Sequence, residues 1–292
     1  MITNRPIVAG IDGSSASLRA ARWAAATAVA RNRPLRLVTA FDWPLGTFTV
    51  GTQQALPDPE EVEAAARQGF AEHLAALREE FPTLRLTRDF VKDRAVHALI
   101  AETLEAELTV LGRRGLGGLT GLLLGSVSTQ VSAHAAGPVV VVPDRPSLPG
   151  PVVVGVDGST GSQTALGFAF EEASWRAADL VVVHAWPRPA DIDRYGYNLY
   201  PEDTQMLADT ERTLLGEALA GWREKYPDVT VRAELVKGDP ADRLVEIGRY
   251  ARLVVVGSRG HGTVAGVLLG SVSRAVLHRA AGPVAIVHPR RD

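Results

Sequence analysis

The chain has 292 residues, 46% hydrophobic and 22% charged, a composition typical of a folded globular protein rather than of a disordered chain or a coiled coil. Its 31 basic and 33 acidic residues leave a net charge of −2, which lacks the basic excess of nucleic-acid and anionic-membrane binders. The absence of cysteine excludes disulfides and thiolate chemistry. No apolar run approaches the about 18 residues of a membrane span, and the first strand-like run begins at Pro6, too early for a signal peptide. We therefore expect a cytoplasmic protein with a small-molecule partner, no nucleic acid and no membrane.

The predicted elements of the first half alternate between two periodicities. Short runs rich in β-branched residues predict strands at residues 7–11, 35–40, 84–91, 108–111 and 139–142. Helical patterns between them predict helices at residues 15–31, 59–80, 95–105 and 126–135. This alternation is typical of a buried parallel sheet with helices on both faces, the doubly wound, Rossmann-like α/β class. Ligands of such sheets bind beyond the carboxyl ends of the strands, here after the first and fourth strands.

The same motifs return at one constant offset. A shift of 145 residues superimposes residues 152–159 (VVVGVDGS) on residues 7–14 (IVAGIDGS), and it continues to match glycines and prolines toward the carboxyl terminus. Chance similarity between apolar runs would not keep an aspartate, glycines and prolines in register, so we infer a tandem duplication. The predicted domains are residues 1–146 and 150–292, separated within a segment whose four prolines disfavour both helix and strand pairing.

The last predicted strand of each half is short and wholly apolar, at residues 139–142 and 284–287. An unpaired sheet edge of this composition would aggregate. We therefore expect these two strands to pair with each other.

The loop after each predicted fourth strand carries one spacing twice: Gly, two residues, Gly, nine residues, Gly-Ser. The positions are Gly112, Gly115 and Gly125-Ser126, then Gly257, Gly260 and Gly270-Ser271. Glycines take positive φ and let backbone N–H groups approach a bulky anion, and a helix that begins at the serine adds its positive dipole end. The loops are predicted to bind phosphate, and the alternative is a flexible turn that ends a strand and caps a helix.

An aspartate follows the first strand of each half, at Asp12 and Asp157. At this end of the sheet, a carboxylate can accept hydrogen bonds from a ribose or lie behind a phosphate-bound metal. The surrounding Asp-Gly-Ser is also a good turn and helix-cap signal, and the local sequence by itself favours that structural role.

With these motifs, the whole chain resembles the universal stress protein family in its tandem two-domain form. Gly-x2-Gly-x9-Gly-Ser resembles the mark of that family's ATP-binding branch. The resemblance implies an adenine nucleotide alpha hydrolase-like fold, ATP with Mg²⁺ as ligand, and a regulatory role in stress response with at most slow hydrolysis. It also implies a homodimer and an unidentified protein partner, and it favours a nucleotide role for the two aspartates.

Carried over by position, the resemblance implies nucleotide-binding residues in both halves. Those of the first half are Gly10, Asp12, Gly112, Arg113, Arg114, Gly115, Gly117, Gly118, Gly125 and Ser126. Those of the second half are Gly155, Asp157, Gly257, Ser258, Arg259, Gly260, His261, Gly262, Gly270, Ser271 and Val272. For the arginines, pairing with phosphate and ordinary surface exposure are equally supported. His261 corresponds to Leu116, which excludes a general base shared by both halves.

Other nucleotide-binding classes fit less well. The three lysines, Lys92, Lys225 and Lys237, lie outside any Gly-Lys-Ser/Thr motif, which excludes Walker chemistry. The first strand is not followed by Gly-x-Gly-x-x-Gly, which argues against a nicotinamide cofactor. An enzyme of the related hydrolase fold stays open, although no His, Asp or Glu cluster recurs at the offset besides the strand-one aspartates. A flavin- or AMP-binding electron-transfer subunit is a third interpretation.

Overall fold

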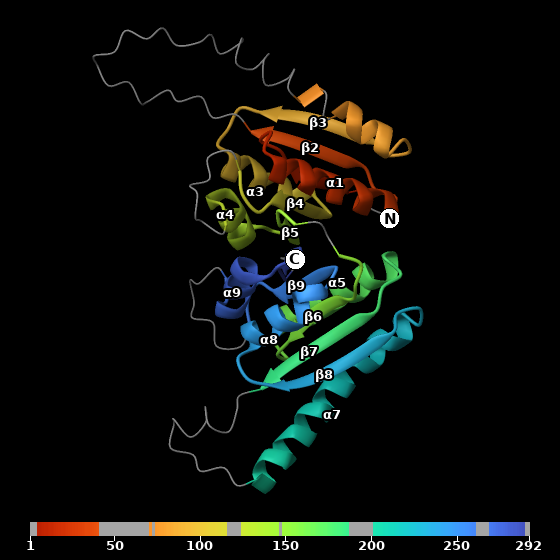
Figure 1. Ribbon diagram of the computed structural model, residues 1–292, viewed down its shortest axis with the longest axis vertical. Helices are drawn as coiled ribbons and strands as arrows, with labels where there is room; N and C mark the ends of the chain where they lie inside the picture. Colours follow the sequence, from red (N-terminus) through yellow and green to blue (C-terminus); the bar gives the residue numbers. More distant parts are fainter. Residues whose placement is uncertain are drawn as a thin grey trace, which may run out of the picture. The chain divides into compact units, whose positions relative to one another are not determined.

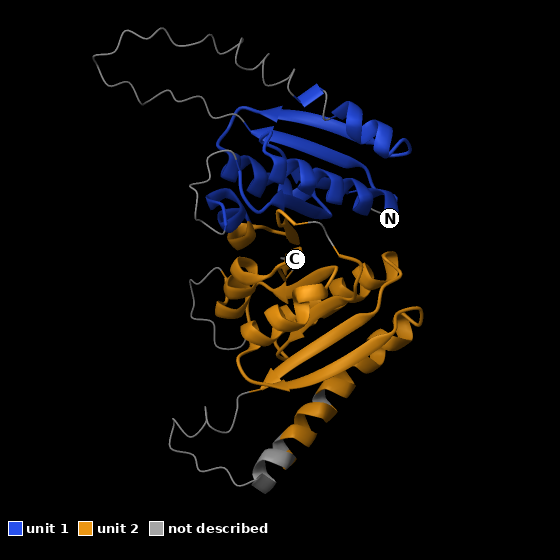
Figure 2. Ribbon diagram, viewed as in Figure 1, with its two compact units in different colours: residues 1–131 blue, residues 132–292 orange. Residues whose placement is uncertain are grey.

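The computed structural model describes residues 5–40, 70–71, 74–115, 124–145, 148–186, 201–260 and 269–289. The chain divides into two compact units, residues 1–131 (unit 1) and residues 132–292 (unit 2), coloured blue and orange in Figure 2. Each unit is an α/β structure built on a mostly parallel sheet, which confirms the predicted fold class.

Unit 1 contains four parallel strands in the order β3-β2-β1-β4 (Figure 1). Their bounds are β1 (Ile7–Gly10), β2 (Leu35–Ala40), β3 (Leu86–Val91) and β4 (Leu108–Gly112). Strand β1 is buried throughout, as expected of a central strand covered on both faces. The chain runs from β1 to β2 on one side and later to β4 on the other, so the strand order reverses at β1. This reversal is where doubly wound sheets bind ligands.

The helices of unit 1 connect these strands. They are α1 (Ser15–Ala30), α3 (Ala95–Glu105) and α4 (Ser126–His134), and residues 74–80 are also helical. Ser14 caps α1, because its Oγ accepts from the Ser17 backbone N–H at 3.1 Å. Ala20, Ala24 and Ala28 are fully buried on one face of α1, and these small side chains let the helix pack closely against the sheet.

Unit 2 contains strands in the order β5-β10-β9-β6-β7-β8. Their bounds are β5 (Val139–Val142), β6 (Val152–Val156), β7 (Leu180–Trp186), β8 (Val231–Lys237), β9 (Leu253–Gly257) and β10 (Val284–Val287). Its helices are α5 (Thr160–Trp175), α7 (Pro201–Lys225), α8 (Pro240–Ile247), a 3₁₀ turn (Gly248–Tyr250) and α9 (Ser271–Arg279). All strand pairs except β5 with β10 are parallel, and β6 lies at the reversal between β7 and β9.

The pairing expected between the two terminal apolar strands is confirmed. Strand β5 pairs antiparallel with β10, with Val140 opposite Ala285. His288, just after β10, adds a contact of 2.9 Å between its Nε2 and the Ser132 backbone oxygen. The pairing places residues 132–145 in unit 2, so the division into compact units falls between residues 131 and 132. The predicted domains, residues 1–146 and 150–292, stay a prediction.

Candidate functional site

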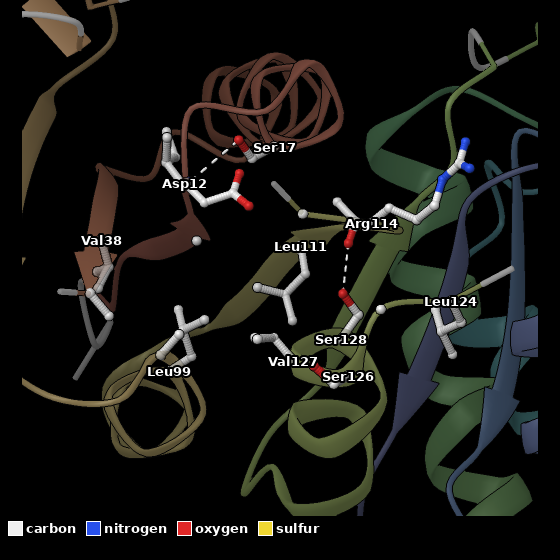
Figure 3. Close-up of a pocket in the computed structure, with 17 residues that line it drawn as sticks. Asp12, Ser17, Val38, Leu99, Leu111, Arg114, Leu124, Ser126, Val127 and Ser128 are labelled. Carbon is white, nitrogen blue, oxygen red and sulfur yellow. Dashed lines mark hydrogen bonds between the residues drawn. The ribbon is translucent and has the colours of Figure 1, made fainter. Parts of the chain in front are cut away.

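A cavity of about 460 Å³ lies at the reversal point of unit 1, within the size range of small-molecule sites. Figure 3 shows its walls: Asp12 comes from the loop after β1, Val38 from β2, Leu99 from α3, Leu111 from β4 and Ser126 from the start of α4. Apolar side chains come from β2, α3 and β4, while the polar side chains come from the loops after β1 and β4 and from the first turns of α1 and α4. This is the first cavity.

Unit 2 contains a second cavity of about 410 Å³. Every residue that lines it lies 145 positions after a residue that lines the first cavity. The substitutions between the two linings are small, for example Leu111 to Val256 and Ala95 to Pro240. The duplication therefore produces two cavities whose lining residues correspond position by position.

The aspartate of each cavity holds the turn that starts the first helix. Asp12 Oδ1 accepts from the Ser14 backbone N–H at 3.0 Å, and Asp157 Oδ1 accepts from the Ser159 N–H at the same distance. The intervening glycine has a φ of 87° in unit 1 and 82° in unit 2. Serine, not aspartate, is the N-cap in both units, so the carboxylate stabilises the turn while the hydroxyl caps the helix.

The second carboxylate oxygen of each aspartate lies against the glycine loop. A Cβ atom at Gly115 would come closer than 3.0 Å to Asp12 Oδ2, and a Cβ at Gly260 would meet Asp157 Oδ2 in the same way. Real Cβ atoms essentially never approach another heavy atom this closely. The middle glycine of each loop is thus required by the aspartate of the same cavity.

The other loop glycines also permit close approach rather than unusual backbone angles. A Cβ at Gly112 would lie 2.7 Å from the Ala16 backbone carbon, and one at Gly257 would lie 2.8 Å from the Gly161 oxygen. The positive φ expected of the loop glycines is wrong for Gly112, Gly115 and Gly125 and for their counterparts in unit 2. Among the described residues, glycines with positive φ are Gly13, Gly158 and Gly238. Sharp turning occurs after the first strand, while the loop after the fourth strand needs space.

Hydrogen bonds fix the two ends of each glycine loop. The Gly125 N–H donates to the Arg113 oxygen and the Gly270 N–H to the Ser258 oxygen, both at 2.8 Å. The Ser128 hydroxyl donates to the Gly112 oxygen at 2.7 Å, and Ser273 repeats this contact with Gly257. The last residue of the fourth strand and the first turn of the following helix are therefore held together beside the cavity.

The amino-terminal residues of α4 and α9 line the cavities. Gly270 is the N-cap of α9, and having no side chain it makes no capping hydrogen bond to the first-turn N–H groups. Such a helix start offers backbone donors and the positive end of the helix dipole to an anion. The combination of a space-requiring glycine loop and a helix start is suited to phosphate.

Most of the predicted site residues line the cavities. They are Gly10, Asp12, Gly112, Arg114, Gly115, Gly125 and Ser126 in unit 1, and Gly155, Asp157, Gly257, Arg259, Gly260, Gly270, Ser271 and Val272 in unit 2. Arg113 and Ser258 do not line them, although their backbone oxygens hold the loop. Gly117, Gly118, His261 and Gly262 lie outside the described residues. The Arg114 guanidinium points away from the Asp12 carboxylate in Figure 3.

Several lining residues of the first cavity were not among the predicted site residues. They are Ile11, Ser17, Val38, Ala40, Ala95, Leu99, Leu111, Leu124, Val127 and Ser128. Val38 and Ala40 alternate along β2, so the period of two places both on the cavity face. The signal was therefore present for β2. Leu99 reaches the cavity from α3, 89 residues after Gly10, and no local motif marks it.

Within the part of the chain that the structure describes, no group of three or more His, Asp and Glu side chains is placed to hold a metal ion. The described helices likewise include none with the length and apolar character of a membrane span. Among the described residues, the ionisable ones that line the first cavity are Asp12 and Arg114, and those of the second are Asp157 and Arg259.

Comparison with known proteins supplies the family. The model of the universal stress protein family matches residues 3–143 and again residues 150–288. The universal stress protein Rv1996 of Mycobacterium tuberculosis is 38% identical over 309 residues, which cover 99% of this chain and 97% of that protein. A universal stress protein structure from Archaeoglobus fulgidus covers 100% of both chains with a TM-score of 0.68 and 19% identity, a likeness of fold. A universal stress protein solved in complex with cAMP is 33% identical, covers 48% of this chain and 96% of its own, and has a TM-score of 0.36.

Proposed function

The chain belongs to the universal stress protein family, and from this premise we propose that it binds one ATP molecule in each of its two cavities. The observation that carries the proposal is the position-by-position match of the two linings at the 145-residue offset. A loop that only ended a strand would not need the same glycines, aspartate, arginine and helix-start serine around two equal cavities. Paired retention of these groups supports a ligand with the same chemistry in both.

Backbone groups would carry most of the phosphate binding. The N–H groups of the glycine loop and of the first turns of α4 and α9 would donate to phosphate oxygens. Asp12 and Asp157 hold the turn with one carboxylate oxygen and lie at the loop with the other, so they would lie beside a nucleotide whose phosphates the loop binds. Mg²⁺ is commonly bound by phosphates with one or two carboxylates, so it would arrive with ATP rather than occupy a protein cage.

We propose a regulatory rather than a catalytic role, with at most slow ATP hydrolysis. Of the residues that the structure describes, one aspartate and one arginine are the ionisable side chains lining each cavity, and both aspartates already stabilise a turn. A hydrolase or phosphotransferase would use a positioned general base, a nucleophile or a metal cluster. Nucleotide occupancy would then act in the stress response of the cytoplasm through a conformational change or a protein partner, with a homodimer as the working assembly.

Mass spectrometry of the nucleotide released from the purified, denatured protein tests the ligand. Calorimetric titration of the nucleotide-free protein with ATP and Mg²⁺ tests the stoichiometry, and we expect two ATP molecules per chain. One ATP per chain would show that one cavity is a structural copy. The absence of adenine nucleotide in the preparation, together with no binding at millimolar ATP, would reject the proposal.

A further inference from the structure

His184, in β7, makes two polar contacts with neighbouring elements of unit 2. Its Nδ1 lies 2.9 Å from the Val156 backbone oxygen, and its Nε2 lies 2.9 Å from Glu211 Oε2. The imidazole therefore connects the last residue of β6 with the middle of α7, while belonging to β7 itself. The position 145 residues earlier is Thr39, which cannot bridge two acceptors as an imidazole does.

A neutral imidazole and an ionised carboxylate together carry too few hydrogens to make both contacts at once. The Val156 carbonyl only accepts, so Nδ1 must carry a hydrogen, and in a neutral imidazole Nε2 is then an acceptor. An acceptor nitrogen facing a carboxylate oxygen has no hydrogen between them. The observed geometry is satisfied when His184 and Glu211 together hold one additional proton, with the imidazolium donating to both partners.

This bridge adjoins the second cavity. Val156 lines that cavity, and so do Val183 and Ala185 on either side of His184 in β7. Since side chains alternate along a strand, the imidazole projects from the face opposite the cavity, toward α7. Loss of the contact to Glu211 would loosen the middle of α7 from the strand pair whose other face forms the cavity wall, while Trp222 and Tyr226 still stack on Phe170 of α5.

Among the described residues, charged groups of the elements around the imidazole contact other partners. On α7 itself, Arg212 Nη1 donates to Asp209 Oδ1. Asp157 follows β6, but its Oδ1 accepts from the turn that follows it. Lys237, from β8, places its Nζ 4.9 Å from the centroid of the Trp186 ring. The segment of α5 from residue 160 to residue 170 contains no charged residue. Glu211 is therefore the ionisable group in direct contact with the imidazole.

We propose that His184 and Glu211 form a proton-dependent clamp that holds α7 against β6 and β7 and makes ligand binding in the second cavity, but not in the first, dependent on pH. The inference about ligand binding rests on the proposed function, while the clamp itself does not. Thr39 stands at the equivalent position of unit 1 and has no imidazole to bring the additional proton, so the second unit would respond to pH where the first does not. While His184 and Glu211 hold the additional proton, α7 is held, and when the proton is lost at higher pH the contact to Glu211 is lost.

Hydrogen exchange of the full-length protein without nucleotide tests the clamp. Exchange of α7 amides, corrected for the chemical pH dependence of exchange, is compared between pH 5.5 and pH 8.5. We expect the opening of α7 to increase about tenfold at the higher pH, as loss of a charge-assisted hydrogen bond implies. In His184→Thr, which installs the residue of unit 1, α7 should open to the same extent at both pH values. In Glu211→Gln, the amide can donate to or accept from Nε2, so α7 should stay closed at both.

The control is His97→Thr, which removes an exposed His97–Asp93 pair at 3.7 Å in unit 1 and should leave α7 unchanged. A wild-type α7 that opens equally at both pH values, or a His184→Thr variant that keeps the wild-type response, would overturn the clamp.

Titrations with ATP at pH 6 and pH 8 then use Gly115→Val and Gly260→Val, which disturb the first and second cavity respectively. Affinity should fall at pH 8 when the second cavity is intact, and this fall should vanish with His184→Thr. An equal affinity at both pH values in that cavity would overturn its coupling to the clamp. If neither cavity binds ATP, the proposed function fails, whereas the exchange measurements still decide whether the clamp exists.

Discussion

The carboxylate of Asp12 lies directly against Gly115, too close for any side chain at that position. Asp157 and Gly260 repeat the relationship in unit 2. The two residues come from loops after different strands, β1 and β4, which are neighbours in the sheet. The glycine loop and the first-strand aspartate are therefore in direct contact, and a substitution of either residue should change the position of the other.

We expect a double-mutant cycle to detect this contact. Gly115→Ala should lower the free energy of unfolding by about 1 to 3 kcal/mol, because the new methyl group collides with the Asp12 carboxylate. In an Asp12→Ala background the collision is gone, so the same substitution should cost at least about 1 kcal/mol less. Chemical denaturation of the four proteins without nucleotide measures the difference.

Gly125→Ala is the matched control for this cycle. A Cβ there would have its nearest neighbour, the Arg113 oxygen, at 3.4 Å, and it has no contact with Asp12. Its cost should be the same with and without Asp12. Additive free energies for Gly115→Ala and Asp12→Ala would contradict the proposed relationship.

ATP binding should be separable between the two cavities. Gly115→Val should displace the Asp12 carboxylate and the adjoining loop, so that binding in the first cavity falls by more than about tenfold while the second cavity is unaffected. Calorimetry should then find one ATP per chain instead of two, and Gly260→Val should show the converse.

The control for these valine variants is Gly216→Val, at a glycine of α7 whose Cβ would meet nothing within 4 Å. It should keep two sites. Thermal unfolding without nucleotide distinguishes a blocked cavity from an unfolded unit. A Gly115→Val protein that still binds two ATP molecules would show that the loop is only a turn, and the proposed function would lose its main support.

The duplication made the fold predictable from the sequence. Because every pattern occurs twice, the second copy helps to define where each element begins and ends. The predicted strand at residues 35–40 and the predicted helix at residues 95–105 have the same bounds in the structure. The third strand begins at Leu86 instead of Leu84, because its first predicted residues lie in the turn that precedes it. Periodicity reports the buried face of an element well and its ends less well.

The site was predictable only where its residues are contiguous. The glycine spacing identified the loop, and the Asp-Gly-Ser motif identified the turn. The reason for the glycine at position 115 was not available, since it depends on a carboxylate about 100 residues away in the sequence that the sheet brings alongside. Ser17 and Leu99 enter the cavity for the same reason, through the packing of helices that have no motif of their own.

Glu102 should make unit 1 more stable at acidic than at neutral pH. Burial is the main reason that the pKa of this α3 carboxyl is raised above 4.5, with Asp89 and Glu105 adding to the rise and Arg36 opposing it. A carboxyl whose pKa is higher in the folded state binds its proton more tightly there than in the unfolded chain. Its contribution to stability is therefore present at low pH and is lost as the pH rises through the raised pKa.

Glu102→Gln removes this dependence, because the amide is neutral at every pH. Its melting temperature relative to wild type should therefore increase from pH 4 to pH 7. Glu80→Gln, at an exposed pair with Arg22, serves as the surface control. A difference between Glu102→Gln and wild type that stays constant or decreases over this range would contradict the assigned direction.

The two units pair equivalent arginines, the buried Arg31 and the partly buried Arg176, with carboxylates from different positions in the sequence. Arg31 Nη1 lies 2.9 Å from Glu107 Oε1, whereas its counterpart Arg176 has its Nε 2.8 Å from Oε2 of the fully buried Glu172. The position corresponding to Glu107 is Arg252, whose Nη1 donates to the Arg176 backbone oxygen at 3.4 Å. The arginine thus occupies the same position in both units, whereas the carboxylate that pairs with it occupies different positions.

Glu172→Thr, which installs the residue found at position 27, should lower the free energy of unfolding by about 3 to 5 kcal/mol, because it removes the partner of a largely buried arginine. Adding Arg252→Glu recreates the arrangement of unit 1, with a carboxylate at the position of Glu107, and should recover at least about 1 kcal/mol of this loss. Glu246→Ala, at an exposed pair with Arg243, should cost less than about 1 kcal/mol and is the control. Denaturant titration measures all four proteins. If Arg252→Glu destabilises the Glu172→Thr protein further, a carboxylate at position 252 cannot replace the one at position 172. The arginine would then need a differently placed carboxylate in each unit.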